Sequence, residues 1–306
     1  MQATIEPGVA EAAQRRDGQN EGGMMPVHEP LTVGIQGESG SFSHEAARAL
    51  LGRGVTVRTE RSFDALFAAV ERGELPAALV PIENTQVGSV HENHERLRKS
   101  RLFAVAETLL RVDPCLVVRP GAAPELLTRV SSHPLLLDQC QGFLRTHPGV
   151  EAVKVLDAAV AVGELMAGGS FTHAVLAPRL AAELHGAQVL SAAVQDEPWN
   201  VTRFLLVARE ARPLDEADGT WKTSLALRLS HGPGMLHRAL SCFAMRGLDL
   251  TKIESRAVPG PPWDYVFYID VVGDPRGAAG DAVEELGGFA RELRLLGSYP
   301  QALLRG

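Results

Sequence analysis

Short apolar runs alternate with amphipathic stretches from residue 31 to residue 208. In the amphipathic stretches apolar side chains recur at helical spacing, as they do from Phe63 to Val70, and Gly73 then stands where a helix would end. Strands that alternate with helices indicate an α/β fold. The expected strands cover 31–36, 55–59, 77–82, 102–112, 129–132, 152–155, 174–177 and 202–208.

Two of these expected strands suggest a division into lobes. The strand at 102–112 is long, and the strand at 202–208 returns late in the chain. This order allows the chain to cross twice between two lobes, near residues 108 and 192, with a ligand cleft between them. We therefore expect residues 31–209 to form one two-lobed α/β domain.

A second, smaller domain is expected after a linker at 210–221. Residues 211–220 carry three acids and a proline without apolar periodicity, which is typical of a linker. The remaining chain, 222–306, predicts strands at 223–230, 250–258, 265–272 and 293–299 and helices at 234–245 and 281–292. That order, βαββαβ, is ferredoxin-like. Leu236, Leu240 and Phe243 have the spacing of the buried face of its first helix.

The charge balance limits the possible partners. Lys and Arg number 30 against 37 Asp and Glu, which gives a formal net charge of −7. Such a chain repels phosphate backbones and anionic membranes, so we expect neither nucleic acid nor a membrane as partner. An anionic ligand would have to be attracted by local geometry.

The cysteines and the first residues bear on the compartment. Cys115, Cys140 and Cys242 are far apart and form no Cys-x-x-Cys pair, which argues against a disulfide framework or a thiolate metal site and favours a reducing cytoplasm. Residues 1–30 lack the apolar core of a signal peptide, and we expect a disordered leader there. No run of about 18 apolar residues predicts a membrane span.

Polar residues gather after the first and third expected strands. The segment 37–43 places Ser39 and Ser41 between a strand and a helix, where hydroxyls and free helix amides can hold a carboxylate or phosphate; alternatively, Ser43 is simply a helix N-cap. The segment 81–90 places Glu83, Asn84 and Thr85 at a strand's carboxyl end, where α/β proteins bind ligands. Turn formation alone also explains such residues. The spacing Ser89-x-x-Glu92 predicts a capping box.

Two later segments have the same character. Ser132-His133-Pro134 joins a strand end to a helix, and His133 either binds a ligand or caps that helix. Asn200-Val201-Thr202-Arg203-Phe204 begins a strand and offers a hydroxyl beside a guanidinium. Each segment alone is a weak signal, and only the set of four is specific.

Together these segments resemble the motifs of the prephenate dehydratase family, over residues 31–300. The second domain is similar to the family's ACT regulatory domain, with Gly234-Met235-Leu236-His237 and Ile253-Glu254-Ser255-Arg256 at its two characteristic positions. The resemblance implies a two-lobed catalytic domain like that of type II periplasmic binding proteins. It also implies a stand-alone enzyme, since no chorismate mutase helix bundle fits into 1–30.

The family converts prephenate to phenylpyruvate with loss of carbon dioxide and water, without a metal or organic cofactor. The resemblance implies that Thr202 donates a hydrogen bond or proton to the departing hydroxyl, within a group that includes Glu83 and Asn84. Arg203 either binds a substrate carboxylate or forms a structural salt bridge. The implied substrate contacts are Ser39, Ser41, Thr85, Ser89, Ser132, His133 and Arg203.

The ACT resemblance implies a homodimer or homotetramer that phenylalanine inhibits from the regulatory domain. The implied effector contacts are Gly234, Met235, Leu236, His237, Asp249, Glu254, Ser255 and Arg256. The sequence departs from the family pattern at several of its motif positions. Leu135 stands where Gln is usual and Ala158 where Thr is usual, while Asp249 replaces Asn and Ala257 replaces Pro in the regulatory domain.

Two other functions remain open from the sequence. Arogenate differs from prephenate only in carrying an amino group in place of the keto group, so an arogenate dehydratase is one alternative. A non-catalytic, amino-acid-sensing binding protein is the other. A periplasmic solute-binding protein is disfavoured by the absence of a signal peptide.

Overall fold

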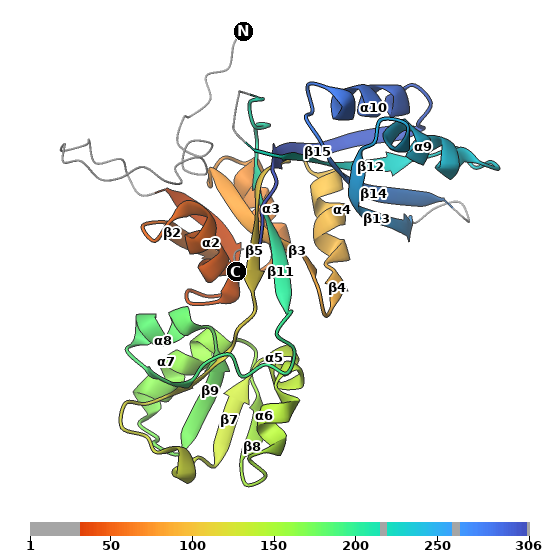
Figure 1. The fold of residues 1–306 in the computed structure, drawn as a ribbon. Coiled ribbons are helices and arrows are strands. Elements are labelled where there is room, and N and C mark those ends of the chain that lie inside the picture. The colour runs from red at the N-terminus through yellow and green to blue at the C-terminus, as the bar shows by residue number, and fades with distance from the viewer. Residues whose placement is uncertain (1–30, 215–218, 259–263, 305–306) are drawn as a thin grey trace.

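The computed structural model describes residues 31–214, 219–258 and 264–304, and three sheets organise this part of the chain (Figure 1). The expected disordered leader at 1–30 lies outside the described residues, as does part of the expected linker. In Figure 1 the first sheet occupies the middle of the molecule, with the second sheet below it and the third above.

The first sheet has the strand order β2-β1-β3-β11-β5, with β4 paired to β3. Strands β1, β2 and β3 run parallel, whereas β11 runs antiparallel to both β3 and β5. Apolar side chains pack on both faces of this sheet, against three helices and against the third sheet. The elements are β1 (Thr32–Gln36), α2 (Phe42–Leu51), β2 (Thr56–Glu60), α3 (Phe63–Glu71), β3 (Ala77–Asn84), β4 (Gly88–Ser89), α4 (His91–Lys99), β5 (Phe103–Arg111) and β11 (Val201–Ala208).

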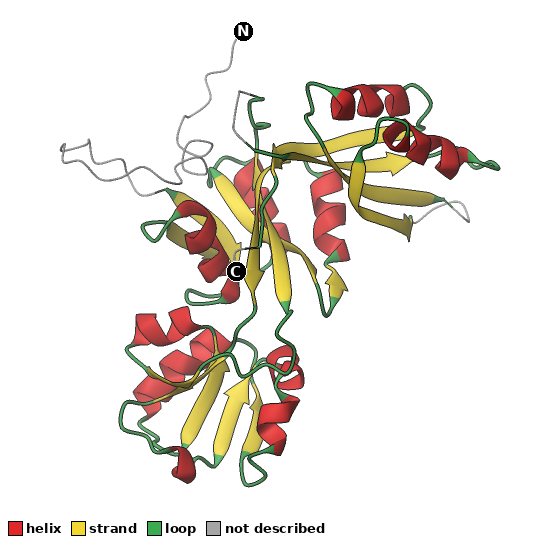
Figure 2. Ribbon diagram, viewed as in Figure 1, coloured by secondary structure: helices red, strands yellow, loops and turns green. Residues whose placement is uncertain are grey.

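The second sheet, in the order β10-β6-β9-β7-β8, forms the second lobe. Its core lies between the sheet and helices on both faces, as Figure 2 shows. The elements are β6 (Cys115–Val118), a 3-10 helix η1 (Pro124–Leu126), β7 (Arg129–Ser132), α5 (Pro134–Gln139), α6 (Gln141–Arg145), β8 (Glu151–Lys154), α7 (Ala158–Gly168), β9 (His173–Ala177), α8 (Arg179–His185) and β10 (Gln188–Ser191).

The chain passes between the lobes at 112–114 and at 192–200. The first crossing was expected near residue 108, but β5 stays paired with β11 as far as Arg111, so the chain leaves the first sheet later. All eight strands expected from 31 to 208 are present, whereas the two-residue strand β4 and strands β6 and β10 were not expected. Strand β4 pairs with β3. Strands β6 and β10 lie in the second lobe. These two strands pair with each other antiparallel, and β10 forms an edge of the sheet.

The third sheet has the order β13-β14-β12-β15 and the element order βαββαβ. Helices α9 and α10 cover one face (Figure 2), and the other face packs on the first lobe through Val266, Tyr268 and Leu296. No described helix is long and apolar enough to cross a membrane. The elements are β12 (Trp221–Arg228), α9 (Met235–Ala244), β13 (Asp249–Ala257), β14 (Tyr265–Val272), α10 (Ala278–Gly287) and β15 (Glu292–Pro300).

Three details of this sheet differ from expectation. Strand β12 begins at Trp221, within the expected linker, because this side chain is buried and paired to β15. Helix α10 was expected to end near residue 292 but ends at Gly287, because Gly287 and Gly288 stand together there. The buried face of α9 consists of Ala239, Cys242 and Phe243, while Leu236 is 39% exposed, so the expected buried role of Leu236 is wrong.

The third sheet is docked on the first lobe by direct approach of two backbones. A Cβ at Gly297 in β15 would lie 2.0 Å from the carbonyl oxygen of Ala104 in β5, and the glycine has φ +152. Only a residue without a side chain permits this contact. The third sheet and the first lobe therefore share one packed interface.

We expect Gly297→Ala to lower the free energy of unfolding by about 2 kcal/mol or more, because the added methyl group must push β15 away from β5. Urea unfolding followed by circular dichroism measures this loss. Gly54→Ala is the matched control, since a Cβ there meets no described atom within 4 Å. Equal unfolding midpoints for the two variants would contradict the tight docking.

Candidate active site

A cavity of about 330 Å³ lies between the two lobes. The carboxyl end of β3 and the start of β11 form its floor, and helix starts from both lobes form its walls. A wider cavity of about 940 Å³ opens beside it and shares His133, Leu156 and Asp157 with it. The polar residues lining the smaller cavity are Ser41, Asn84, Ser89, His133, Gln139, Asp157 and Thr202.

Asn84 and Thr202 form a pair at the floor of this cavity. Asn84 lies opposite Thr202 in the β3–β11 register, and its Nδ2 donates to Thr202 Oγ1 at 2.9 Å. The same amide nitrogen donates to Asn200 Oδ1 at 2.8 Å, and Asn84 Oδ1 accepts from the backbone amides of Gln86 and Val87. Because Thr202 Oγ1 accepts a hydrogen bond from Asn84, its own hydroxyl proton can be donated to an acceptor in the cavity.

Helix N-termini surround the cavity with partial positive charge. Asp157 Oδ1 caps α7 by accepting from the amides of Ala159 and Val160, and Glu45 Oε1 accepts from the amide of Leu180 at the start of α8. His133 Nδ1 accepts from the amide of Leu135 and so caps α5, as one of the two alternatives expected.

Helices α2 and α4 differ, because no described side chain caps their first turns. Their N-cap residues, Ser41 and Val90, both line the cavity. The Oγ atom of Ser41 is buried and has no hydrogen-bond partner among the described residues. Free amides and an unused hydroxyl can hold an anion in spite of the net charge of −7. The expected cap at Ser43 is wrong, since this residue lies inside α2.

Arg203 points to the opposite face of the sheet, since side chains alternate along β11. It is 5% exposed. Its Nε donates to Glu107 at 2.6 Å, its Nη1 to Glu83 at 2.7 Å and Asp270 at 2.6 Å, and its Nη2 to the Tyr299 hydroxyl at 2.8 Å. The guanidinium therefore forms salt bridges within the protein and does not reach the cavity beside Thr202, contrary to the expected substrate contact.

Glu83 lies beside Arg203 and not beside Thr202. Its two oxygens pair with Arg203 Nη1 at 2.7 Å and with Lys252 Nζ at 3.0 Å. Burial alone would raise the pKa of Glu83, but these two cations outweigh burial and lower the pKa to about 2. Glu83 and Arg203 line another cavity of about 430 Å³, which shares Asn84, Gly88 and Ser89 with the interlobe cavity but is not lined by Thr202. At neutral pH it is a paired anion with no proton to give.

Several other expected substrate contacts are engaged elsewhere. Thr85 Oγ1 donates to the carbonyl of Trp199 and accepts from the amide of Val201, and Ser132 Oγ donates to the carbonyl of Leu176. Ser39 is exposed and lines neither interlobe cavity. Of the catalytic and substrate residues expected from the sequence, the smaller cavity brings together Ser41, Asn84, Ser89, His133 and Thr202.

Ser89 is not the capping residue that the sequence predicts. The N-cap of α4 is Val90, and Ser89 Oγ instead donates to Glu254 Oε2 at 2.5 Å and accepts from Lys252 Nζ at 2.7 Å. Leu135 and Ala158, the departures from the family pattern, both line the cavity and make its wall on the second lobe more apolar.

Sequence reasoning assigned no role to four residues at this site. Asn200, within the expected segment 200–204, accepts a hydrogen bond from Asn84, and Gln139 lines the cavity and has a buried Oε1 without a partner among the described residues. Lys154 and Arg61 supply cations to the wider cavity. A charged residue at the end of an expected strand, as Lys154 is, could have signalled its position. Among the described residues no group of three or more His, Cys, Asp or Glu could hold a metal ion.

The expected effector residues do not gather within one chain. Met235 and Leu236 line a cavity of about 380 Å³ with Tyr265, next to Gly234, which has φ +76 and begins α9. Asp249 pairs with Val272, at the far end of β13 from Ala257 and its partner Tyr265. His237, Ser255 and Arg256 are exposed, whereas Glu254 faces the first lobe, where it accepts a hydrogen bond from Ser89.

Comparison with known proteins gives consistent results. Residues 33–212 match the prephenate dehydratase family. The chain is 37% identical over 292 residues to arogenate dehydratase/prephenate dehydratase 1, chloroplastic, of Arabidopsis thaliana, covering 90% of this chain and 73% of the relative. A prephenate dehydratase of Arthrobacter aurescens in complex with L-Phe has a TM-score of 0.79 at 31% identity, covering 89% of this chain and 90% of that one.

A further solved structure carries a different description. A protein described as a novel type of quorum quenching acylase has a TM-score of 0.80 at 31% identity, covering 88% of this chain and 97% of that one. The family match covers more than half of the present chain and includes Asn84, Thr202 and the whole interlobe cavity. The chain belongs to the prephenate dehydratase family.

Proposed function

We propose that this protein is a lyase that converts prephenate to phenylpyruvate in the cavity between its lobes, as the initial step of a branch towards phenylalanine. Members of its family catalyse this decarboxylating dehydration. The observation that carries the proposal is the Asn84–Thr202 pair, which presents an oriented hydroxyl to a cavity with uncapped helix starts.

The reaction requires little acid or base chemistry. The bond between the ring and its carboxylate breaks and releases carbon dioxide, its electrons enter the ring, and the carbon–oxygen bond opposite breaks. The departing hydroxide takes up one proton from solvent and leaves as water. A threonine hydroxyl is too weak an acid to supply that proton outright, so Thr202 stabilises the departing oxygen as a hydrogen-bond donor. Asn84 holds it in that orientation.

The two substrate carboxylates need positive potential. The first-turn amides of α2 and α4, with the unpartnered Ser41 hydroxyl, suit one of them. Lys154 and Arg61 in the wider cavity suit the other. With this division, the reacting ring of the substrate lies beside Thr202 and the substrate's keto-acid side chain extends into the wider cavity.

Arogenate is a second candidate substrate. Four carboxylates, those of Glu38, Glu60, Asp157 and Glu164, also line the wider cavity and suit the ammonium group that arogenate carries in place of the keto group. The Arabidopsis relative is named for both activities. Incubation of the purified protein with prephenate or with arogenate distinguishes the two substrates through release of phenylpyruvate or phenylalanine. An N-acylated amine tests for the acylase activity named for one similar solved structure, through release of free amine.

We also propose regulation by phenylalanine in a homo-oligomer, dimer or tetramer, in a reducing cytoplasm. The Arthrobacter aurescens relative was solved with L-Phe. Strand β13 is an edge of the third sheet, with Ile253 50% exposed and Met245 84% exposed nearby at the end of α9, so a second copy could cover this edge. Cys115, Cys140 and Cys242 are free thiols, which suits a reducing compartment.

We expect Thr202→Ala to lower kcat for prephenate by roughly 100-fold with little change in melting temperature, because the hydrogen bond to the departing oxygen is lost. Thr202→Ser keeps the hydroxyl and should retain most of the activity. Phenylpyruvate formation measures both variants. Wild-type turnover by a folded Thr202→Ala protein would contradict the role of this hydroxyl.

Arg203→Lys should lower the free energy of unfolding by about 3 kcal/mol, because an ammonium cannot replace the guanidinium among its buried carboxylates. We expect KM for prephenate to change less than about threefold, since Arg203 does not line the cavity beside Thr202. Arg53→Lys, at an exposed position, is the control. A large rise in KM without loss of stability would instead support the substrate contact.

Isothermal titration should show L-phenylalanine binding to the oligomer, with the affinity lowered about tenfold or more in Met235→Ala, because Met235 lines the cavity at the start of α9. We expect Asp249→Asn to change the affinity as well if a second copy brings Asp249 to that cavity, and size-exclusion chromatography reports the assembly. Absence of heat and of inhibition up to millimolar L-phenylalanine would contradict the regulation.

A further inference from the structure

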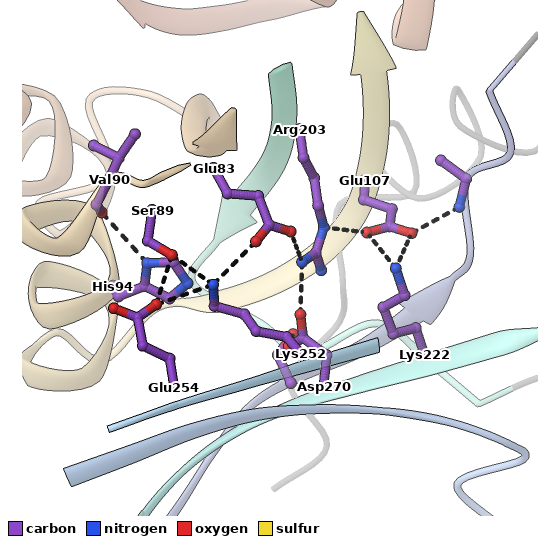
Figure 3. Close-up of polar contacts among 12 residues, drawn as sticks. Glu83, Ser89, Val90, His94, Glu107, Arg203, Lys222, Lys252, Glu254 and Asp270 are labelled. Carbon is purple, nitrogen blue, oxygen red and sulfur yellow. Dashed lines mark hydrogen bonds and ion pairs between the residues drawn. The ribbon is translucent and has the colours of Figure 1, made fainter. Parts of the chain in front are cut away.

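Strand β13 of the regulatory sheet contacts a residue that lines the catalytic cavity. Lys252 Nζ donates to Ser89 Oγ at 2.7 Å, and Glu254 Oε2 accepts from the same hydroxyl at 2.5 Å (Figure 3). Ser89 lines the smaller interlobe cavity directly before the N-cap of α4. A side chain of the cavity wall is therefore held by two residues more than 160 positions later in the chain.

The contact extends to both sides of the α4 N-cap. Glu254 Oε1 lies 2.7 Å from His91 Nδ1, and His91 is the first residue of α4. Ser89 and His91 thus flank Val90, the N-cap whose helix start faces the cavity without a capping side chain from the described residues. A shift of β13 relative to the first lobe would move this helix start and its amides.

Lys252 is the central cation of this cluster. Its side chain is 7% exposed, and it also pairs with Glu83 Oε2 at 3.0 Å and Glu254 Oε2 at 3.1 Å. Figure 3 shows the cluster continuing from Glu83 to Arg203 and Asp270. Glu83 and Arg203 directly adjoin Asn84 and Thr202 in the sequence, so both catalytic strands are tied to the regulatory sheet.

A buried ammonium between two carboxylates has a demanding geometry. If the lysine charge is removed, Glu83 and Glu254 repel each other, and the Ser89 hydroxyl loses the donor that orients it. Ser255 and Arg256, which the family resemblance assigns to the effector, follow Glu254 in the same strand. The strand that carries these effector residues also carries the residues that hold the cavity wall.

We propose that Lys252 and Glu254 are positioning residues for the catalytic cavity, which hold Ser89 and the start of α4 and through them let the regulatory domain control binding of the substrate anion. This inference rests on the proposed function. The inference predicts that the regulatory domain acts chiefly on KM. Ser89 and the start of α4, which Lys252 and Glu254 hold, are proposed to bind the substrate and do not touch the departing hydroxyl.

A double-mutant cycle tests the link. We expect Lys252→Met and Ser89→Ala each to raise KM for prephenate roughly tenfold, and the double variant to be no worse than the worse single variant, because both remove the same arrangement. Lys222→Met is the matched control. The Lys222 side chain is 8% exposed and pairs with Glu107 in the same interface, but among the described residues it forms no hydrogen bond or ion pair with Ser89. It should lower the melting temperature and leave KM within about twofold.

Additive effects of Lys252→Met and Ser89→Ala on KM would overturn the proposal, as would an equal rise in KM in Lys222→Met. If Lys252→Met fails to fold, Glu254→Gln keeps the shape of the cluster and enters the same cycle with Ser89→Ala. Calorimetric titration with phenylpyruvate measures the same cycle as changes in affinity, without turnover. An inactive wild-type protein would refute the proposed function alone. Additive changes in phenylpyruvate affinity would refute the positioning role.

A second readout concerns the effector. L-Phenylalanine should raise KM for prephenate in the wild type, and the factor should fall to near one in Lys252→Met, although the affinity for L-phenylalanine measured without substrate stays within about threefold. If L-phenylalanine raises KM in Lys252→Met as much as in the wild type, the effect does not depend on Lys252 and the proposal is overturned.

Discussion

The buried guanidinium of Arg203 is the interaction on which the rest of the structure depends. Three carboxylates and a tyrosine hydroxyl, from two strands of the first sheet and two of the third, meet around one cation. Burying so many charges is favourable only when each has a partner, so the position of each strand is fixed by the others. Arg203, next to Thr202 on β11, thereby joins the first sheet to the third.

The alternation of side chains along β3 and β11 puts the cavity-lining residues and the salt-bridged residues on opposite faces of the sheet. Asn84 and Thr202 face the cavity, while Glu83 and Arg203, their neighbours in β3 and β11, face the third sheet. The two pairs lie side by side in register, on opposite faces of the same two strands. The same short segments thus carry a polar pair that lines the interlobe cavity and an ionic cluster that joins the first lobe to the third sheet.

The sequence predicted the strands and their order because apolar periodicity is a local property. It missed β10, a half-buried edge strand, and β6, an apolar run close behind β5. It located the segments of the site but not the direction of each side chain. The cap expected from Ser89-x-x-Glu92 failed because Glu254 and Lys252, far along the chain, hold Ser89. Arg203 was left between two roles since its partners are distant in sequence.

The position of β11 has a consequence for how the enzyme assembles during synthesis. The second lobe, residues 115–191, is inserted between β5 and β11, so the strand that joins β3 to β5 in the first sheet is made only after the whole insertion. Pairing of such distant segments is a slow step in folding. Since Thr202 lies on β11, the Asn84–Thr202 hydrogen bond at the floor of the cavity forms only once this late strand has paired with β3.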